Sequence, residues 1–224
     1  MVKILITGSG KGLGLALHDE LKNQGHTVYD YDIKENADVR NPDFLDSIQE
    51  LDILINNAGV NIIDWLENFT EDQWDKVMDT NAKGIYMMAT ACLPMLIKSK
   101  GTIVNIVSNA AHMPMTCSLA YNASKAAAHI MTLQMARELT KKHGITVFGI
   151  APNKLSGTGM SDSIDEQVVK TRGWSKEYAQ EYQLNGLLTG EETPPKLLAE
   201  FVAYLLKDKQ HHKYLTGCIL PYGA

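Results

Sequence analysis

The chain has 224 residues, 45% of them hydrophobic and 21% charged, and a formal net charge of −5 at pH 7. These values are ordinary for a globular protein, and the mild acidic excess argues against nucleic acid or an anionic membrane as the main partner. A chain of this length can bury a substantial core, so we expect one compact domain over residues 1–224.

The cysteines and the apolar runs indicate the compartment. Cys92, Cys117 and Cys218 are odd in number and lack CxxC spacing, which predicts a reducing compartment without a disulfide framework or a zinc site. The first residues lead at once into a glycine-rich turn and are too short for a signal peptide. The longest apolar stretch, residues 85–97, is too short to span a bilayer. We therefore expect a cytoplasmic protein with no membrane partner and no metal.

Strand-length apolar runs alternate with segments of helical period along the chain. This alternation predicts an α/β fold with a doubly wound parallel sheet of Rossmann type and helices on both faces. In chain order we predict strand 2–7, helix 12–23, strand 27–31, strand 52–56, helix 71–98 opened by Thr70, strand 102–107, helix 120–142, strand 145–150, helix 195–206 and strand 217–220.

Two segments depart from this alternation. Only five residues separate Asp32 from Asp38, too few for the helical crossover of a complete strand–helix–strand unit. The third strand should therefore be a stub near residues 38–40 or be absent. The segment at about 155–192 is polar and weakly periodic. Its length favours a lid or pocket wall near the substrate, with a peripheral helical insertion as the alternative.

The sequence TGSGKGLG, residues 7–14, joins the first strand to the first helix. Glycines at such a turn allow the backbone to approach a pyrophosphate closely, and the positive end of the helix dipole favours the phosphate charge. This pattern predicts a dinucleotide-binding loop. The expected cofactor contacts in it are Gly8, Gly10, Lys11, Gly12, Leu13 and Gly14.

Asp32 lies at the end of the second strand, 18 residues after Gly14. A carboxylate at this spacing accepts hydrogen bonds from a ribose 2′-hydroxyl and repels a 2′-phosphate, which favours NAD over NADP. Lys11 points the other way, because its ammonium could pair with a 2′-phosphate. We expect the carboxylate to prevail and predict NAD, with NADP as the alternative.

Tyr121 and Lys125 lie four residues apart on a predicted helix and so share one face. A free phenol has a pKa of about 10, and a neighbouring ammonium lowers it toward the range useful for acid–base catalysis. Ser108 comes 13 residues before Tyr121, at the carboxyl end of a strand, where open α/β sheets bind their ligands. Its hydroxyl could hydrogen-bond a substrate oxygen beside the tyrosine.

These motifs resemble those of the short-chain dehydrogenase/reductase family, in the same order and spacing. The likeness extends from the glycine loop nearly to the end of the chain. The matching residues are Thr7, Gly8, Gly12 and Gly14 in the glycine pattern, the run Asn56, Asn57, Ala58 and Gly59, the helical Asn81, the set Ser108, Tyr121 and Lys125, and the terminal Leu215, Thr216, Gly217 and Gly223.

The resemblance implies an NAD(P)-dependent oxidoreductase that moves a hydride between a nicotinamide and a carbonyl or secondary alcohol of a small-molecule substrate. In it Tyr121 exchanges a proton with the substrate oxygen, and Lys125 lowers the pKa of Tyr121 and binds the nicotinamide ribose. Ser108 orients the substrate and stabilises charge on its oxygen, and Asn81 holds a water that links Lys125 to solvent. The family's long helices also build dimers and tetramers, so we expect a homodimer or homotetramer, unless their broad apolar faces are simply core.

The same resemblance extends the cofactor site, with two departures. Asn153 replaces the family's glycine after Pro152, and we expect it to keep the turn because asparagine tolerates left-handed backbone. Gly157 stands at the spacing of the threonine that contacts the carboxamide, and Thr158 comes one residue later. The implied cofactor contacts are Asp38, Val39, Asn57, Ala58, Gly59, Tyr121, Lys125, Pro152, Asn153 and Leu155.

The substrate side carries weaker patterns. His112, Met113, Met115 and Cys117 precede Tyr121, and Trp65, Met160 and Trp174 lie in other segments expected near the pocket mouth. They predict an apolar pocket, although methionine and tryptophan also fill ordinary packing gaps. Two alternative functions stay open: an NADPH-dependent reductase of 3-oxoacyl type, and a cofactor-sensing module without turnover.

Overall fold

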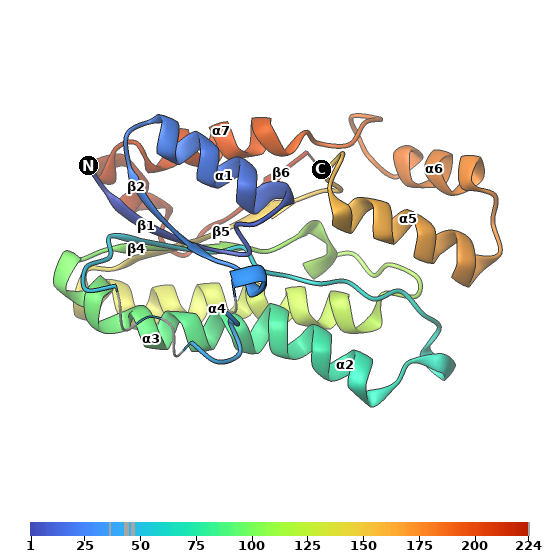
Figure 1. Cartoon of the computed structure of the whole chain (residues 1–224), viewed down its shortest axis with the longest axis horizontal. Helices are drawn as coiled ribbons and strands as arrows, with labels where there is room; N and C mark the ends of the chain where they lie inside the picture. The colour runs from blue at the N-terminus through green and yellow to red at the C-terminus, as the bar shows by residue number, and fades with distance from the viewer. Residues whose placement is uncertain (36, 43–44, 46–47, 224) are drawn as a thin grey trace.

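One parallel sheet forms the centre of the molecule. The computed structural model describes residues 1–35, 37–42, 45 and 48–223 (Figure 1). The strands run parallel in the order β2-β1-β3-β4-β5-β6. This confirms the predicted α/β fold of Rossmann type. The strands are β1 (Lys3–Thr7), β2 (Thr27–Tyr31), β3 (Ile53–Asn56), β4 (Thr102–Ile106), β5 (Thr146–Pro152) and β6 (Ile219–Tyr222).

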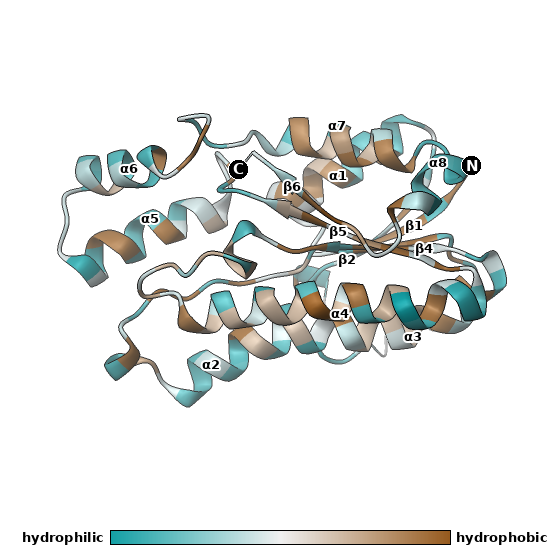
Figure 2. Cartoon of the chain, turned by 180° about the vertical axis from the view of Figure 1, so that it is seen from behind, coloured by the Kyte–Doolittle hydropathy of each residue, from teal (hydrophilic) through white to brown (hydrophobic). Residues whose placement is uncertain are grey.

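Helices cover both faces of the sheet, as predicted. The helices α1 (Gly12–Asn23) and α7 (Pro195–Leu206) pack on one face, and α3 (Gly84–Ser99) and α4 (Leu119–His143) on the other (Figure 1). Side chains of a strand alternate between the two faces, so Ile4 and Ile6 join the core under α1 and α7 while Leu5 joins the core under α3. The apolar strands therefore lie between two helical layers (Figure 2).

The predicted helix 71–98 has an interruption. Thr70 caps α2 (Glu71–Met78) by accepting from the Gln73 amide, and the Gln73 side chain accepts from the Thr70 amide. After α2 the chain makes a π-helical turn, η4 (Asp79–Lys83), and then continues as α3. Such turns are rare, are often found at functional sites, and change the direction of the side chains they carry. This one carries Asn81.

The short strand expected near residues 38–40 does not form in the described residues, so the strand named β3 is the later one at Ile53–Asn56. β2 leads into the short turn η1 (Ile33–Glu35), and the pairing between Asp38 and Asn41 is an isolated bridge. The prediction of a reduced or absent third strand is therefore confirmed for residues 37–42. Part of the connection to β3, residues 43–44 and 46–47, lies outside the described residues.

The segment predicted as a lid or insertion is helical. It contains α5 (Gly159–Arg172), capped by Thr158, and α6 (Lys176–Asn185), capped by Ser175. These two helices, named here the α5–α6 wall, lie together beyond the carboxyl end of the sheet (Figure 1). No helix in the described residues is long and apolar enough to cross a membrane. The short elements are η3 (Leu66–Asn68), η5 (Asn109–Ala111), α8 (Lys209–His212) and η6 (Lys213–Leu215).

Candidate active site

A large cleft lies at the carboxyl ends of the strands and has a volume of about 1250 Å³. Clefts for small ligands have volumes of roughly 300–1,000 Å³, so this one can hold a nucleotide together with a second molecule. The predicted residues Gly10, Gly14 and Asn81 do not line it. The predicted residues that do are Gly8, Lys11, Gly12, Leu13, Asp32, Asp38, Val39, Asn57, Ala58, Gly59, Ser108, Tyr121, Lys125, Pro152, Asn153 and Leu155.

The glycine loop is packed tightly against the segment that follows β3. Gly8 has left-handed backbone, φ +67°, and a Cβ there would lie 2.9 Å from the Ala58 Cα atom. A Cβ on Gly14 would lie 2.0 Å from the Gly8 carbonyl oxygen. The Asn57 amide group donates to the carbonyls of Thr7 and Gly8, at 3.0 and 3.1 Å. Only glycine therefore fits at these two positions, which leaves bare main chain beside the cleft.

Asp32 is fixed beside this loop at the end of β2. Its side chain is almost fully buried, and its two oxygens accept from the amides of Gly10 and Lys34, each at 2.9 Å. The Lys34 ammonium lies 3.4 Å from the Gly10 carbonyl oxygen and also lines the cleft. Lys34 could not be predicted from the sequence, because one lysine in a polar turn carries no distinguishing pattern.

Asp38 and Val39 follow along the same side of the cleft. Arg40 donates to both Asp38 oxygens, with its Nη2 atom 2.6 Å from Oδ2, and this pairing lowers the pKa of the Asp38 carboxyl. Val39 is buried against α3, where a Cβ on Gly84 would lie 2.7 Å from the Val39 Cγ2 atom. Arg40 was likewise absent from the sequence prediction.

Tyr121 and Lys125 lie on one face of α4, with the Lys125 Nζ atom 5.8 Å from the centre of the tyrosine ring. Ser108 follows β4, and its hydroxyl accepts from the Ala110 amide at 3.1 Å. Burial raises the pKa of Tyr121, while a side-chain hydrogen bond with Ser108 lowers it. Burial is the larger of these two influences. The expected lowering of this pKa by Lys125 stays a prediction.

Lys125 is itself buried, and burial lowers its pKa to about 8. Its ammonium donates to the Ile106 carbonyl oxygen at 2.9 Å. Gly59 lies between Lys125 and Asn81, since a Cβ at Gly59 would lie 3.8 Å from the Lys125 Nζ atom and 3.4 Å from the Asn81 Oδ1 atom.

The fully buried Asn81 side chain is bound within the protein. Its Oδ1 atom accepts from the Val60 amide at 2.8 Å, and its Nδ2 atom donates to the Val60 carbonyl and to the Ser124 hydroxyl. The side chain therefore holds the segment after Gly59 against α4. Its expected hold on a water remains a prediction.

Asn122, next to Tyr121, is a positioning residue that the sequence analysis missed. Its Nδ2 atom donates to the carbonyls of Ala110 and Met113, at 2.6 and 2.7 Å, and its Oδ1 atom accepts from the Met115 amide at 3.3 Å. These bonds tie the loop that contains Ser108 to the first turn of α4. An asparagine at the start of a helix is too common to predict such a role.

The expectation for Asn153 is corrected. Within the described residues only Lys100 and Cys117 combine left-handed backbone with a side chain, so Asn153 does not replace the glycine by that geometry. Instead its side chain donates to the Gly223 carbonyl and accepts from the Thr193 hydroxyl at 2.6 Å. It thereby joins the end of β5 to the segment after β6.

Thr158 is buried at the edge of the cleft, and its hydroxyl oxygen accepts from the Ser161 amide at 3.0 Å. Gly157 beside it has left-handed backbone, φ +60°. The one-residue shift relative to the family therefore places a helix cap at this point. Whether Thr158 also contacts a carboxamide remains a prediction.

The α5–α6 wall closes one side of the cleft. Its segment is anchored by Lys154, whose ammonium pairs with Asp165 at 2.5 Å and with Glu192 at 2.8 Å. At the other end of α5, Arg172 donates to the Thr116 carbonyl oxygen at 2.7 Å. The segment at 155–192 is therefore helical and lines the cleft. That it contacts the substrate stays a prediction.

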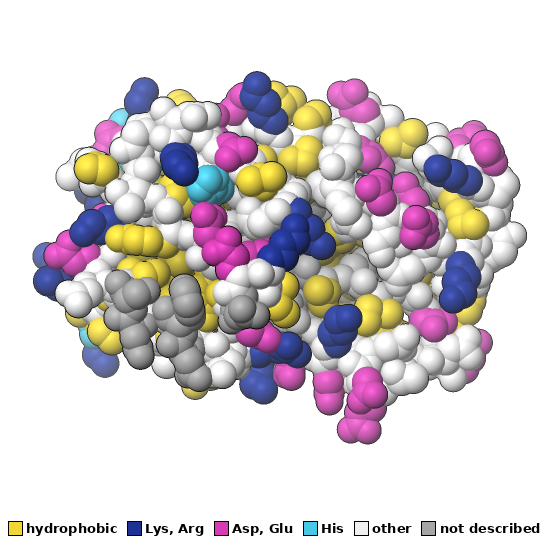
Figure 3. All heavy atoms as spheres, in the orientation of Figure 1, with side chains coloured by type: hydrophobic (Ala, Val, Ile, Leu, Met, Phe, Trp, Pro, Cys, Tyr) yellow, Lys and Arg dark blue, Asp and Glu magenta, His cyan; other side chains and the backbone are white. Residues whose placement is uncertain are grey.

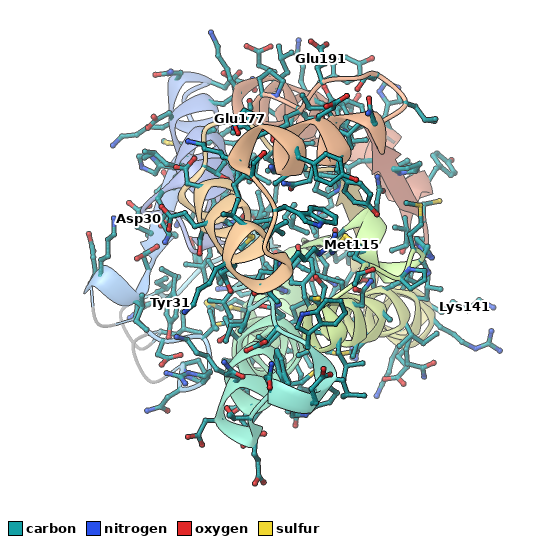
Figure 4. All side chains as sticks on the ribbon, turned by 90° about the vertical axis from the view of Figure 1, so that its right-hand side faces the viewer. Asp30, Tyr31, Met115, Lys141, Glu177 and Glu191 are labelled. Carbon is teal, nitrogen blue, oxygen red and sulfur yellow. The ribbon has the colours of Figure 1, made fainter. Side chains whose placement is uncertain are left out.

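The expected substrate-side residues divide into two groups. His112, Met113, Met115 and Met160 line the cleft. Met115 lies between the α5–α6 wall and the helices α2 and α4 (Figure 4). Cys117 and Trp174 pack instead into the small core of the wall, and the Trp65 indole donates to the Thr171 carbonyl oxygen. No group of three His, Cys, Asp or Glu in the described residues could hold a metal ion.

Known proteins are similar to this chain in sequence. Residues 32–169 match the family model described as short chain dehydrogenase, which covers more than half of the chain. Sorbitol-6-phosphate 2-dehydrogenase of Klebsiella pneumoniae is 31% identical, over 96% of this chain and 91% of that protein. A 3-oxoacyl-[acyl-carrier-protein] reductase of Staphylococcus epidermidis is 27% identical, over 95% of this chain and 93% of that protein.

Solved structures agree with the fold. An actinorhodin polyketide ketoreductase with NADPH superposes with a TM-score of 0.86 at 25% identity, over 98% of this chain and 95% of that one. NAD⁺-bound xylitol dehydrogenase superposes with a TM-score of 0.90 at 22% identity, over 100% and 98% of the two chains. The family model and the 31%-identical relative show that the chain belongs to the short-chain dehydrogenase family, whose members are oxidoreductases that use nicotinamide cofactors.

Proposed function

We propose that this chain is an NAD-dependent dehydrogenase or reductase that interconverts a secondary alcohol and a carbonyl compound, with Tyr121 as the acid–base group. The observation that carries the proposal is the set of Ser108, Tyr121 and Lys125, which line the same cleft as the glycine loop. The bare main chain at Gly8, which lines the cleft, would allow a dinucleotide to approach the loop closely, and Gly14 lets the following helix start tight against it. A bound nicotinamide supplies the hydride acceptor or donor.

The chain's own groups supply the proton. In the oxidation direction the Tyr121 oxygen takes the proton of the substrate hydroxyl, and in reduction it returns that proton to the carbonyl oxygen. The Ser108 hydroxyl binds the same substrate oxygen and lowers the pKa of Tyr121 through their hydrogen bond. Lys125 contributes an ammonium close to the phenol, and Asn81 braces the segment at Gly59 on which this arrangement rests.

Replacement of Tyr121 by Phe tests the proposal. We expect turnover with NAD and a panel of secondary alcohols to fall by about 10²–10⁴-fold, the usual contribution of a positioned acid–base group, while NADH binding is retained. Tyr204→Phe is the matched control, because Tyr204 is exposed on α7 and remote from the cleft lining. Unchanged turnover in Tyr121→Phe would favour the alternative of a cofactor-sensing module.

The preference for NAD is part of the proposal and is supported by Asp32. Its buried carboxylate beside Gly10 would repel a 2′-phosphate and accept from a 2′-hydroxyl. Titration with NADH and NADPH at one salt concentration, followed by nicotinamide fluorescence, should show tighter NADH binding. Asp32→Asn should reduce that preference, whereas Asp30→Asn, on the same strand but outside the cleft lining, should not.

A second candidate is an NADPH-dependent reductase of 3-oxoacyl type. Lys11 and Lys34 favour it, because both line the cleft beside Asp32 and could together pair with a 2′-phosphate. Tighter binding of NADPH than of NADH in the same titration, lost on Lys34→Gln, would establish this candidate over the first.

We also propose that residues 1–224 act as one catalytic unit in a reducing compartment, as a homodimer or homotetramer. The cleft draws its lining from residues 8 to 188, which supports a single unit. Cys92, Cys117 and Cys218 are all free thiols. Basic and acidic side chains are mixed over the face in Figure 3, with no continuous basic patch of the kind that binds nucleic acid on that face.

A further inference from the structure

Cationic side chains line the cleft throughout, Lys11, Lys34, Arg40 and Lys76 among them, but its carboxylates are confined to one part of the sequence. The carboxylates in the lining come from residues 32–79: Asp32, Asp38, Asp72, Asp75 and Asp79. From residue 106 onward the described lining contains His112, Lys125, Lys154 and Arg172 and no carboxylate. The lining contributed by residues 106–188, named here the substrate half, therefore contains cations and no carboxylate, although the chain as a whole carries a net charge of −5.

Arg172 is the cation in this half that has no other assigned partner. Lys125 belongs to the proposed acid–base group, and Lys154 is paired with Asp165 and Glu192. In the described part of the chain Arg172 forms no ion pair; it makes one hydrogen bond, from its Nη2 atom to the Thr116 carbonyl. Its Nε atom is buried without an acceptor, which is costly for a charged donor.

The guanidinium is nonetheless held in place. It lies over the ring of Trp174 at 4.8 Å and near the ring of Tyr182 at 5.7 Å. Aromatic contacts of this kind orient an arginine without cancelling its charge. The Thr116 contact places it against the loop that Asn122 ties to Tyr121. Arg172 thus lies against the loop that leads to the proposed reacting group.

We propose that the substrate carries an anionic group, a phosphate or a carboxylate, remote from the reacting carbon, and that Arg172 is the residue that selects it. This inference rests on the proposed function. An oxyanion supplies both things that the guanidinium lacks, a negative partner and acceptors for its free N–H groups, and arginine binds either group through two parallel hydrogen bonds.

Kinetics with matched charged and neutral substrates test the inference. The phosphate pair is D-sorbitol 6-phosphate and D-sorbitol, and the carboxylate pair is 3-hydroxybutyrate and its methyl ester, each with NAD. We expect the charged member of one pair to have a kcat/KM at least about 10-fold above its neutral partner, which also tells phosphate from carboxylate. Arg172→Gln should abolish that ratio mainly through KM, leaving the neutral partner within about two-fold.

Arg137→Gln is the control, because it makes the same charge change at an exposed position on α4 outside the cleft lining. Arg172→Lys should keep part of the preference, since it retains the charge but not the planar fork. If Arg172→Gln lowers kcat/KM equally for charged and neutral substrates, Arg172 is only a brace between α5 and residue 116, and the inference is overturned. Equal rates for both members of both pairs in the wild-type protein also overturn it.

A binding measurement keeps the inference separate from the proposed function. With the protein saturated by NAD⁺, inorganic phosphate or acetate should change the tryptophan fluorescence saturably, because Trp174 lies beside Arg172. The change should be lost in Arg172→Gln and kept in Arg137→Gln and in Tyr121→Phe. No saturable change with either anion overturns the inference while leaving the proposed function to the Tyr121→Phe test.

Discussion

Burial shifts the pKa values of Tyr121 and Lys125 in opposite directions, raising the first and lowering the second to about 8. Both shifts favour the neutral form, because the charged form of each group loses its hydration in the protein. Ser108 is the group that works against this for the phenol. At the residue scale, Lys125 is therefore protonated below about pH 8 and carries a buried charge that lowers the free energy of unfolding.

This gives a prediction for stability against pH. An unfolded lysine has a pKa near 10.5, so between pH 8 and 10.5 the unfolded chain binds a proton at residue 125 that the folded chain has released. The contribution of Lys125 to stability should therefore rise through this window, by up to about 3 kcal/mol. Urea unfolding gives the free energy of unfolding of the wild type and of Lys125→Met at pH 7.5 and at pH 10.5. The value for the wild type minus that for Lys125→Met should be larger at pH 10.5 by the contribution of Lys125.

Lys141→Met serves as the control for the titration of other groups, because Lys141 is exposed near the end of the same helix (Figure 4). Its difference from the wild type should stay constant across the window. A constant difference for Lys125→Met as well would show that the Lys125 ammonium is not penalised by burial.

Lys100 offers a stability test outside the site. It ends α3 with left-handed backbone, φ 50°, a conformation that costs a side-chain-bearing residue about 1–2 kcal/mol. Glycine is the preferred residue at such a helix end. Lys100→Gly should therefore raise the free energy of unfolding by about 1 kcal/mol, measured with urea. Lys98→Gly, inside the last turn of the helix, should lower it by a similar amount.

At the element scale, the α5–α6 wall depends on one ionic cluster. Lys154 pairs with Asp165 on α5 and with Glu192 before α7, and the Gln183 side chain on α6 also donates to Asp165. The Lys154 side chain is 13% exposed, and its two partners are 18% and 22% exposed. Removal of the lysine would leave two poorly hydrated carboxylates close together.

Lys154→Met should therefore destabilise the wall more than the sheet. We expect a loss of roughly 1–3 kcal/mol, below the range for fully buried pairs because these groups retain some solvent. Amide hydrogen exchange in α5 and α6 should accelerate while that of β3 to β5 stays slow. Lys196→Met removes an exposed ion pair with Glu200 and should change neither. Equal acceleration in wall and sheet would contradict a local anchor.

The difference between the sheet and the α5–α6 wall also explains which elements could be predicted from the sequence. β1 to β5 and α1, α4 and α7 were predicted to within about two residues, because they pack on a continuous core that imposes a clear apolar period. The wall helices pack instead on a small core around Ile63, Val168 and Ala179 and so show little period. The π-helical turn at Asn81 was missed because it interrupts a pattern that is helical on both sides.

At the scale of the whole molecule, the site divides in a similar way. Residues in contiguous motifs, such as Gly8 and Tyr121, could be placed in the cleft from their order and spacing. The contacts from Arg172 to Thr116 and from Lys154 to Glu192 join residues 56 and 38 positions apart, and no local pattern records them. The cationic character of the substrate half exists only after folding, because it depends on which carboxylates turn away from the cleft.

The proposed oligomer is the last property at this scale. On α3 and α4, which cover the same face of the sheet, Tyr86 is 54% exposed and Ile130 is 61% exposed. Neither side chain is therefore core, the alternative that the sequence left open. Both side chains are available for an interface, and helices from two copies could bury them against each other.

Ile130→Glu should therefore shift the protein toward monomers, because it would bury a carboxylate without a partner in the interface. Light scattering coupled to size-exclusion chromatography measures the mass directly. Leu66→Glu, at a position 70% exposed on η3 and away from α3 and α4, is the control and should leave the mass unchanged. A wild-type protein of 24.8 kDa at micromolar concentration would contradict the proposed oligomer. An unchanged mass for Ile130→Glu would place the interface on another face.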